Sequence, residues 1–352
     1  MNTNKKIYIR NEINPHEYRT PIVPQDVSIL IANGFIVYVE SSFHRIFGNE
    51  EYKENGGIIT DKPWYDVLFN DALIIGLKEM NDLDKLSNHR HMFFSHSYKN
   101  QTGSQYLLQQ FSKSKNIIYD FEYFLDNNNK RIISFGYYAG IVGAILALLQ
   151  YVNKKQNKPN ISNLSYWNNK DEIIKQLNEN VNLLDNIQIA VVGSRGNCGK
   201  GIADVLNILN IDYTKIHRAS DKSKLKDYDI LYNCIALDST ENEIWFDNNT
   251  QFDKDIIISD ISCDYSKPNN PIQLYDNPTS WETPVYKYND NVDIIAINNL
   301  PSLLPKESSI YFSKKCVELL LDAGSESWKK NEQFYYDTVE SFIQHKTTFL
   351  HS

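Results

Sequence analysis

Four glycines between an apolar run and an amphipathic run are the feature that most constrains the fold of this chain. Residues 189–192 are apolar, the glycines occupy positions 193, 196, 199 and 201, and apolar residues then recur at helical spacing over 202–209. Glycines let a backbone approach a pyrophosphate, and the first N–H groups of the following helix point at it. The stretch therefore predicts a strand, a tight turn and a helix that cradle a dinucleotide. The alternative is a turn that binds nothing, because the spacing is not the usual G-x-G-x-x-G.

Length and composition limit the class of protein. The 352 residues suffice for two domains of ~100–200 residues each. The net charge of -8, without a local basic cluster, argues against a nucleic-acid partner. Four cysteines with no C-x-x-C pair predict neither a disulfide framework nor a metal site, so we expect a reduced, cytoplasmic protein. The N-terminal residues lack the apolar core of a signal peptide.

Residues 135–152 form the one segment that suggests a membrane. They are apolar and nearly uncharged, but the run is marginal for the ~20 residues that span a bilayer, and it contains Gln150. We expect a buried helix here and no membrane partner.

The first part of the chain has a β-α-β rhythm. Strands are predicted at residues 6–10 and 35–40, in runs that begin at residues 73, 92 and 117, and at residues 131–136, with a helix at 25–34. Ligands of open α/β sheets bind outside the carboxyl ends of the strands. Lys78 and His96 follow two of these strands, so they lie where chemistry is expected.

Further strand-like runs lie at residues 213–216, 229–235, 255–260 and 292–298, and the C-terminal residues are helical. The fold class is therefore α/β, with two Rossmann-like, doubly wound parallel-sheet domains and a cleft between them. We expect the C-terminal helices to return to the first domain. The predicted domains are a substrate domain at 1–136 plus 300–352 and a dinucleotide-binding domain at 137–299.

A set of short motifs extends over most of the chain. Taken together, in this order and spacing, they resemble the lysine-forming saccharopine dehydrogenases, which are distant relatives of alanine dehydrogenase. The motifs are Arg10-x-Glu12; Glu17-x-Arg19-x-Pro21-x-x-Pro24; Gly76-Leu77-Lys78-Glu79; His96-x-Tyr98-Lys99-x-Gln101; Tyr119-Asp120-x-Glu122; Arg131 before Phe135-Gly136-x-x-Ala139-Gly140; Gly193-x-x-Gly196-x-Cys198-Gly199-x-Gly201; Asn233-Cys234-Ile235; Asp260-x-Ser262-x-Asp264; Asn270-Pro271-Ile272; and Leu300-Pro301-Ser302-Leu303-Leu304-Pro305-x-Glu307.

The resemblance implies a pyridine-nucleotide oxidoreductase that oxidises the secondary amine joining lysine to 2-oxoglutarate and hydrolyses the imine, or runs the reverse condensation. It implies that Lys78 accepts the amine proton, that His96 transfers protons around imine hydrolysis, and that Arg19 and Arg131 clamp substrate carboxylates. Further residues implied at the substrate site are Lys99, Gln101, Glu79, Glu122 and Asn298, with Glu17 in support. Those implied at the cofactor site are Gly193, Ser194, Arg195, Gly196, Asn197, Cys198, Gly199, Cys234 and Asp260. Arg218 and Ser220 are added to them from a departure from the family pattern that is described below.

The side-chain chemistry agrees with these roles. A lysine acts as a general base only when burial or other cations lower its pKa, and nearby carboxylates oppose that effect. Imidazole titrates near neutral pH, and the planar fork of arginine fits a carboxylate. Outside the motifs, any one strand-end Lys, Arg or Glu is most often a solvated charge. Two other functions remain open: an alanine-type dehydrogenase that uses ammonia, and a catalytically silent nucleotide-binding regulator.

Two positions depart from the family pattern. The acid expected some 20 residues after the first glycine, which binds the ribose, is replaced by Arg218 with Ser220 nearby. This favours NADP or a relaxed NAD(P) preference, and the alternative is that Asp221 reaches the ribose. Asn298 stands where the family has Asp, and Asn14 where some relatives have Lys, so a substrate other than saccharopine or a changed pH optimum is expected.

The motifs also contain two cysteines, Cys198 and Cys234, that match cysteines of the family. If the glycine turn and the next strand lie side by side, these residues form either an oxidation-sensitive pair or two buried thiols.

Overall fold

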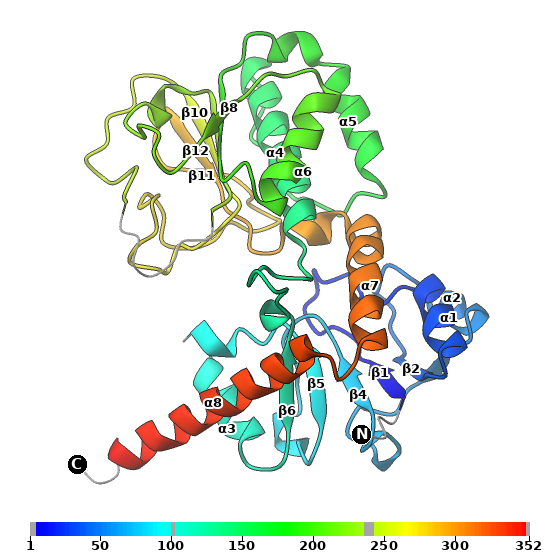
Figure 1. Ribbon diagram of the computed structural model, residues 1–352. Helices are drawn as coiled ribbons and strands as arrows, with labels where there is room; N and C mark the ends of the chain where they lie inside the picture. The colour runs from blue at the N-terminus through cyan, green and yellow to red at the C-terminus, as the bar shows by residue number, and fades with distance from the viewer. Residues whose placement is uncertain (1–4, 100–102, 236–242, 350–352) are drawn as a thin grey trace. The chain divides into compact units, whose positions relative to one another are not determined.

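The computed structural model describes residues 5–99, 103–235 and 243–349 and divides the chain into two compact units. Unit 1 comprises Met1–Ser134 and Pro305–Ser352, and unit 2 comprises Phe135–Leu304. Each unit contains one six-stranded sheet with helices packed on it (Figure 1). The predicted α/β class with two Rossmann-like sheets is confirmed. The cleft, and the assignment of substrate and dinucleotide to separate domains, stay predictions.

The sheet of unit 1 is parallel, with strand order β3-β2-β1-β4-β5-β6. The order reverses between β1 and β4, which is the point where ligands of such sheets bind. The strands are β1 (Lys6–Ile9), β2 (Ile36–Glu40), β3 (Ile58–Thr60), β4 (Leu73–Ile75), β5 (Arg90–Phe93) and β6 (Ile117–Asp120), and the helices are α1 (Pro24–Ala32), α2 (Asn49–Glu54), α3 (Ser104–Phe111), α7 (Pro305–Leu321) and α8 (Glu326–Phe349).

The C-terminal helices complete unit 1. Helix α7 packs against α1, and the Ser309 hydroxyl on α7 accepts a hydrogen bond of 3.0 Å from the Thr20 N–H. Helix α8 lies along β6 (Figure 1), where the Asn331 side chain bonds both the N–H and the C=O of Asp120 at 3.0 and 2.8 Å. The C-terminal helices thus supply hydrogen-bond partners to backbone N–H and C=O groups of the first part of unit 1.

One predicted strand of unit 1 is wrong. Residues 131–136 join no sheet: Arg131 makes a single antiparallel bridge with Leu125, and α4 already begins at Gly136. The Asp126 N–H bonds the Lys130 carbonyl at 2.8 Å, so the run turns back on the residues before it. The short edge strand β3 was not predicted.

The sheet of unit 2 has strand order β11-β12-β10-β9-β7-β8 and is parallel except for β11. Its order reverses between β7 and β9, directly at the glycine stretch. The strands are β7 (Ile189–Val192), β8 (Thr214–Ile216), β9 (Ile230–Asn233), β10 (Ile256–Asp260), β11 (Tyr286–Lys287) and β12 (Val292–Ile295), and the helices are α4 (Gly136–Lys155), α5 (Lys170–Asn178) and α6 (Asn197–Ile208).

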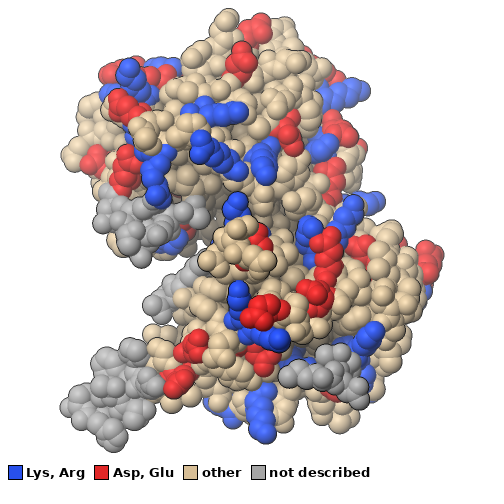
Figure 2. Space-filling view, in the orientation of Figure 1, with Lys and Arg blue, Asp and Glu red and all other residues tan. Residues whose placement is uncertain are grey.

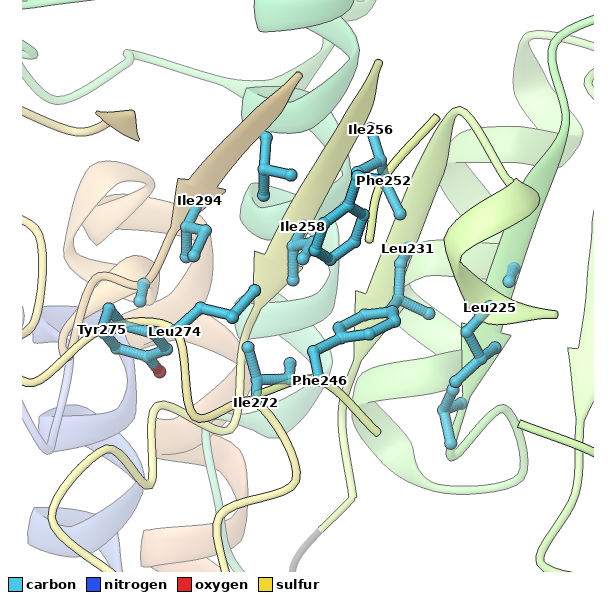
Figure 3. Close-up of a cluster of buried hydrophobic side chains, with 14 of the residues drawn as sticks. Leu225, Leu231, Phe246, Phe252, Ile256, Ile258, Ile272, Leu274, Tyr275 and Ile294 are labelled. Carbon is cyan, nitrogen blue, oxygen red and sulfur yellow. The ribbon is translucent and has the colours of Figure 1, made fainter. Parts of the chain in front are cut away.

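Side chains from irregular segments build part of the core of unit 2. Phe246, Phe252 and Ile272 lie outside the named strands and pack with strand residues such as Leu231 and Ile258 (Figure 3). All five side chains are at least nine-tenths buried. This cluster ties the segments that follow β9 and β10 to the sheet.

Helix α4 is long and apolar enough to cross a membrane, with a mean hydropathy of 1.2, but 67% of its apolar window is buried in the structure. It packs against α6 and β10 within unit 2. A Cβ on Gly140 would lie 2.0 Å from the Cys198 carbonyl oxygen, and one on Gly201 would lie 2.0 Å from the Tyr137 oxygen. The two helix backbones therefore touch through glycines, and the predicted buried helix is confirmed.

Acidic and basic side chains are mixed on the face shown in Figure 2, where Lys and Arg are interspersed with Asp and Glu on both units. A surface of mixed sign creates no single field that would attract a polyanion to this face.

Candidate functional site

The glycine turn after β7 has its shape because a side chain would not fit at two positions. Gly193 has φ +89°, and a Cβ there would lie 2.8 Å from the Cys234 carbonyl oxygen. A Cβ on Gly199 would lie 2.5 Å from the Ser194 Cα. The turn therefore folds tightly under the first residues of α6.

Gly196, at the N-cap of α6, is different because the protein does not crowd it. A Cβ there would approach only the Gly193 oxygen, at an ordinary 3.5 Å. The Ser194 Oγ is buried and has no hydrogen-bond partner among the described residues, while Arg195 and Asn197 are exposed. An open glycine, an unsatisfied hydroxyl and a helix N-terminus together fit the pyrophosphate of a dinucleotide.

The two cysteines of the cradle lie together as free thiols. A hydrogen bond with Cys234 is the largest cause that raises the pKa of the Cys198 thiol, and burial adds to it. The Cys234 thiol in turn donates to the Val192 carbonyl at 3.0 Å. A thiol with a raised pKa forms little thiolate, so Cys198 is a poor nucleophile in this state.

A tight turn follows β8, at the place where the sequence lacks the acidic residue that usually binds the adenosine ribose. Arg218 is exposed, and the Ser220 hydroxyl accepts a hydrogen bond of 3.0 Å from the His217 N–H. The Asp221 carboxylate accepts from the Ser223 N–H at 2.9 Å, and hydrogen bonds from Ser223 hold the pKa of Asp221 below its usual range. The Asp221 carboxylate is therefore hydrogen-bonded within its own turn.

Sequence reasoning missed Lys222 in this turn. Its side chain is nearly buried, its ammonium group bonds the Arg218 carbonyl, and it lies 3.3 Å from the Glu243 carboxylate. Nothing in the sequence distinguishes Lys222 from its neighbour Lys224, which is exposed.

Asp260, predicted to contact the cofactor, is fully buried at the end of β10. Its carboxylate accepts hydrogen bonds from the Tyr275 hydroxyl at 2.6 Å, the Asn233 side chain at 2.9 Å and the Cys263 N–H at 3.2 Å. Burial raises the pKa of Asp260 to about 6. These hydrogen bonds join the ends of β9 and β10, and the contact of Asp260 with the cofactor stays a prediction.

In unit 1, a buried ion pair holds the residues that follow β4. The Glu12 carboxylate accepts from the N–H groups of Leu77 and Lys78 at 2.6 and 2.9 Å. The Arg10 guanidinium lies 3.6 Å from Glu12 and donates to the carbonyl oxygens of Lys78 and Glu79. Burial raises the pKa of Glu12, and Arg10 opposes that shift. The main-chain N–H and C=O groups of Lys78 are therefore both held by hydrogen bonds.

A second buried carboxylate holds Ser95, the residue before His96. Asp120, which is fully buried at the end of β6, accepts from the N–H and hydroxyl of Ser95 at 3.2 and 2.6 Å and from the Glu122 N–H at 2.8 Å. His96 itself has φ +53°, a conformation that is uncommon outside glycine and often marks a functional position. Burial raises the pKa of Asp120 to about 6. Asp120 thus ties the turn of His96 to that of Glu122.

Both arginines predicted as clamps have a carboxylate partner. Arg19 pairs with Glu17 through two hydrogen bonds of 2.7 and 2.6 Å, and both side chains are buried. The exposed Arg131 lies 3.4 Å from Glu122. A carboxylate on a guanidinium fixes its orientation, so these contacts position both arginines.

The remaining predicted residues are less informative. Glu79 and Asn298 are exposed after β4 and β12 respectively. The side chain of Lys99 is not described, and Gln101 lies outside the described residues. The structure does bring Lys78, His96 and Glu122 to the carboxyl ends of the neighbouring strands β4, β5 and β6.

Two Rossmann-like sheets, with a glycine turn in unit 2 and Lys78 and His96 at strand ends in unit 1, are the arrangement expected of a dinucleotide-dependent oxidoreductase. A family model for the alanine dehydrogenase/PNT N-terminal domain matches residues 8–142. Among solved structures, L-alanine dehydrogenase has a TM-score of 0.66 at 13% identity and covers 93% of this chain and 92% of that one. The transhydrogenase of Sinorhizobium meliloti has a TM-score of 0.66 at 12% identity, covering 92% and 97%. These likenesses establish the fold.

Sequence relatives identify the family. The saccharopine dehydrogenase [NAD(+), L-lysine-forming] of Candida glabrata is 32% identical over 329 residues, covering 87% of this chain and 88% of that protein. The Neurospora crassa protein of the same name is 29% identical over 358 residues, covering 95% and 96%. The chain belongs to the saccharopine dehydrogenase family, and the predicted resemblance is confirmed. It is accordingly an oxidoreductase that acts on CH–NH groups.

Proposed function

We propose that this protein uses a nicotinamide dinucleotide to oxidise the secondary amine between an amino acid, lysine by default, and a 2-oxo acid, 2-oxoglutarate by default, or to form that amine by reductive condensation. The observation that carries the proposal is the pair Lys78 and His96 at the ends of adjacent strands. Each lies in a turn held by a buried carboxylate, Glu12 or Asp120. Such fixed positions are what proton transfer requires.

In this proposal Lys78 accepts the proton of the secondary amine, and His96 transfers protons as water adds to the imine and the resulting carbinolamine collapses. Arg19 and Arg131 bind carboxylates of the substrate. Two hydrogen bonds with Glu17 hold one edge of the Arg19 guanidinium, which fixes its orientation for a substrate carboxylate. Glu79, Glu122, Lys99, Gln101 and Asn298 complete the proposed substrate site.

The bound nicotinamide would accept or supply the hydride. We infer that its pyrophosphate lies on residues 193–199, against the open Gly196 and the buried Ser194 hydroxyl. The relatives are named for NAD(+), but Arg218 and Ser220 replace the ribose acid, and a cation and a hydroxyl suit a 2′-phosphate better than a diol. We therefore propose NADP or a dual preference for this chain. The free thiols fit the reducing cytoplasm, which we propose as its location.

The test is the oxidation of NADPH and NADH by the full chain in the presence of 2-oxoglutarate and lysine, followed by a panel of other amines and 2-oxo acids. Turnover that requires an amino acid supports the proposal. Equal turnover with ammonium in place of lysine would support the alanine-type alternative instead. Nucleotide binding without turnover on any pair would favour a catalytically silent regulator.

A further inference from the structure

The turn after β8 contains a buried cation that the proposed function does not use. Lys222 is 8% exposed, although lysine is among the residues that are least often buried. Its ammonium group donates to the Arg218 carbonyl and pairs with Glu243 at 3.3 Å. A buried ammonium needs such partners, and it also brings a fixed charge to the place where it is held.

That place is the proposed cofactor site. Strands β8 and β9 flank β7 in the sheet, and Lys222 and Glu243 follow β8 and β9 in the chain. Their ion pair therefore joins the segments on either side of the glycine cradle. In a dinucleotide fold the adenosine ribose lies at the end of the strand after the cradle, which here is β8.

The charges of this turn suit a phosphate on the ribose. Arg218, Ser220 and Lys222 offer a guanidinium, a hydroxyl and an ammonium within five consecutive residues. A phosphate monoester carries nearly two negative charges at neutral pH and accepts several hydrogen bonds. The ammonium of Lys222 has three donors, of which the Arg218 carbonyl and Glu243 take two.

Glu243 is the group that such a phosphate would compete with. Its side chain is 56% exposed, whereas that of Lys222 is 7% exposed. The carboxylate can therefore leave the pair and be hydrated, while the ammonium stays in place. NAD, which has a 2′-hydroxyl, leaves the pair intact.

We propose that Lys222 is a specificity-determining residue that binds the 2′-phosphate of NADP, and that Glu243 is the counter-ion which this phosphate displaces. The inference rests on the proposed nicotinamide site. It goes further in making opposite predictions for the two partners: loss of Lys222 weakens NADPH binding, and neutralising Glu243 strengthens it.

The test is a fluorescence titration of NADPH and of NADH against the wild-type chain, Lys222→Met and Glu243→Gln. A charge-assisted hydrogen bond supports a loss of about tenfold or more in NADPH affinity for Lys222→Met, with NADH affinity unchanged within about twofold. Glu243→Gln should bind NADPH several-fold more tightly and NADH as before. The matched control is Lys224→Met, which removes an exposed lysine from the same turn and should leave both affinities unchanged.

Equal weakening of both nucleotides in Lys222→Met would overturn the inference, because it would show a structural role. An NADPH affinity that is unchanged in Lys222→Met, or that falls in Glu243→Gln, would also overturn the inference. Since Lys222 is buried, the thermal unfolding of each variant is recorded, and Lys222→Arg, which keeps the charge, should retain the preference for NADPH. If Lys222→Met does not fold, the substitution of the exposed Glu243 by Gln decides the question alone.

Wild-type protein that binds neither nucleotide would refute the proposed function itself. Binding of NADPH and NADH without these differences between the variants would refute only this inference.

Discussion

At the scale of single residues, the candidate site depends on buried side chains that hold the backbone of its turns. Glu12 and Arg10 fix the peptide groups around Lys78, and Asp120 fixes the turn that carries His96. These carboxylates are buried and hydrogen-bonded to main-chain N–H groups, so they act through geometry. Lys78 and His96, the proposed proton-transfer groups, are themselves partly exposed, as residues that must meet a substrate need to be.

Replacing Lys78 tests the proposed base. Lys78→Met should reduce turnover by roughly 10²–10⁴-fold, which is the usual contribution of a positioned acid or base. The cofactor affinity should stay within a few-fold of wild type, because Lys78 lies in unit 1 and the glycine cradle in unit 2. Steady-state kinetics and NADPH titration measure the two effects. Normal turnover in this variant would remove Lys78 from the mechanism.

Asp120 gives a prediction about pH. Burial raises its pKa from 3.8 to about 6, so between these values the folded protein holds a proton that the unfolded chain has released. The stability that this group contributes is complete below the unfolded pKa and is lost as the pH rises through about 6. The wild-type free energy of unfolding, relative to that of Asp120→Asn, should therefore increase as the pH falls from about 7 to about 4, by at most about 3 kcal/mol. Urea unfolding of both proteins across this range measures it, and a difference that is constant or falls would contradict the assignment.

At the scale of elements, glycines decide how closely the helices and turns of unit 2 approach. Three of the four glycines in the cradle are required by protein contacts: Gly193 and Gly199 shape the turn, and Gly201 allows α6 to touch α4. Gly196 is not required in this way. The sequence shows four similar residues, whereas the structure separates them into those needed for packing and the one left open for a ligand.

Two alanine substitutions separate these roles. Gly201→Ala places a methyl group 2.0 Å from the Tyr137 oxygen, so it should destabilise the protein by roughly 1–3 kcal/mol or more. Gly196→Ala meets nothing closer than 3.5 Å, so its stability should stay within about 0.5 kcal/mol of wild type while NADPH binding weakens. Thermal unfolding and NADPH titration of both variants provide the comparison. Unchanged nucleotide affinity in Gly196→Ala would argue against a pyrophosphate at that position.

At the scale of the whole molecule, the chain builds unit 1 in two pieces and unit 2 in one. Helices α7 and α8 return to unit 1 and supply Ser309 and Asn331, whose side chains bond the backbone of Thr20 and Asp120. Unit 2 has its own sheet and its own core cluster, and it uses one continuous stretch of chain.

This difference predicts how the units behave in isolation. A fragment of residues 135–304 should fold, show a cooperative thermal transition and bind NADPH, because its core is complete without other residues. It should have no turnover, since Lys78 and His96 are absent. Circular dichroism and NADPH titration test the fragment. A fragment that is unfolded under native conditions would show that unit 2 depends on unit 1.

The sequence by itself determined most strands and helices, the glycine turn and the family, because hydrophobic period and motif spacing are local properties of the chain. It also placed Lys78 and His96 at strand ends. It failed for residues 131–136, where an apolar run resembles a strand but pairs with Leu125 instead of the sheet. Only the tertiary structure decided which polar residues are buried supports, as Asp120 and Asp260 are, and which lysine of the β8 turn is held by Arg218 and Glu243. Burial and hydrogen-bond partners depend on segments distant in sequence, and no local pattern records them.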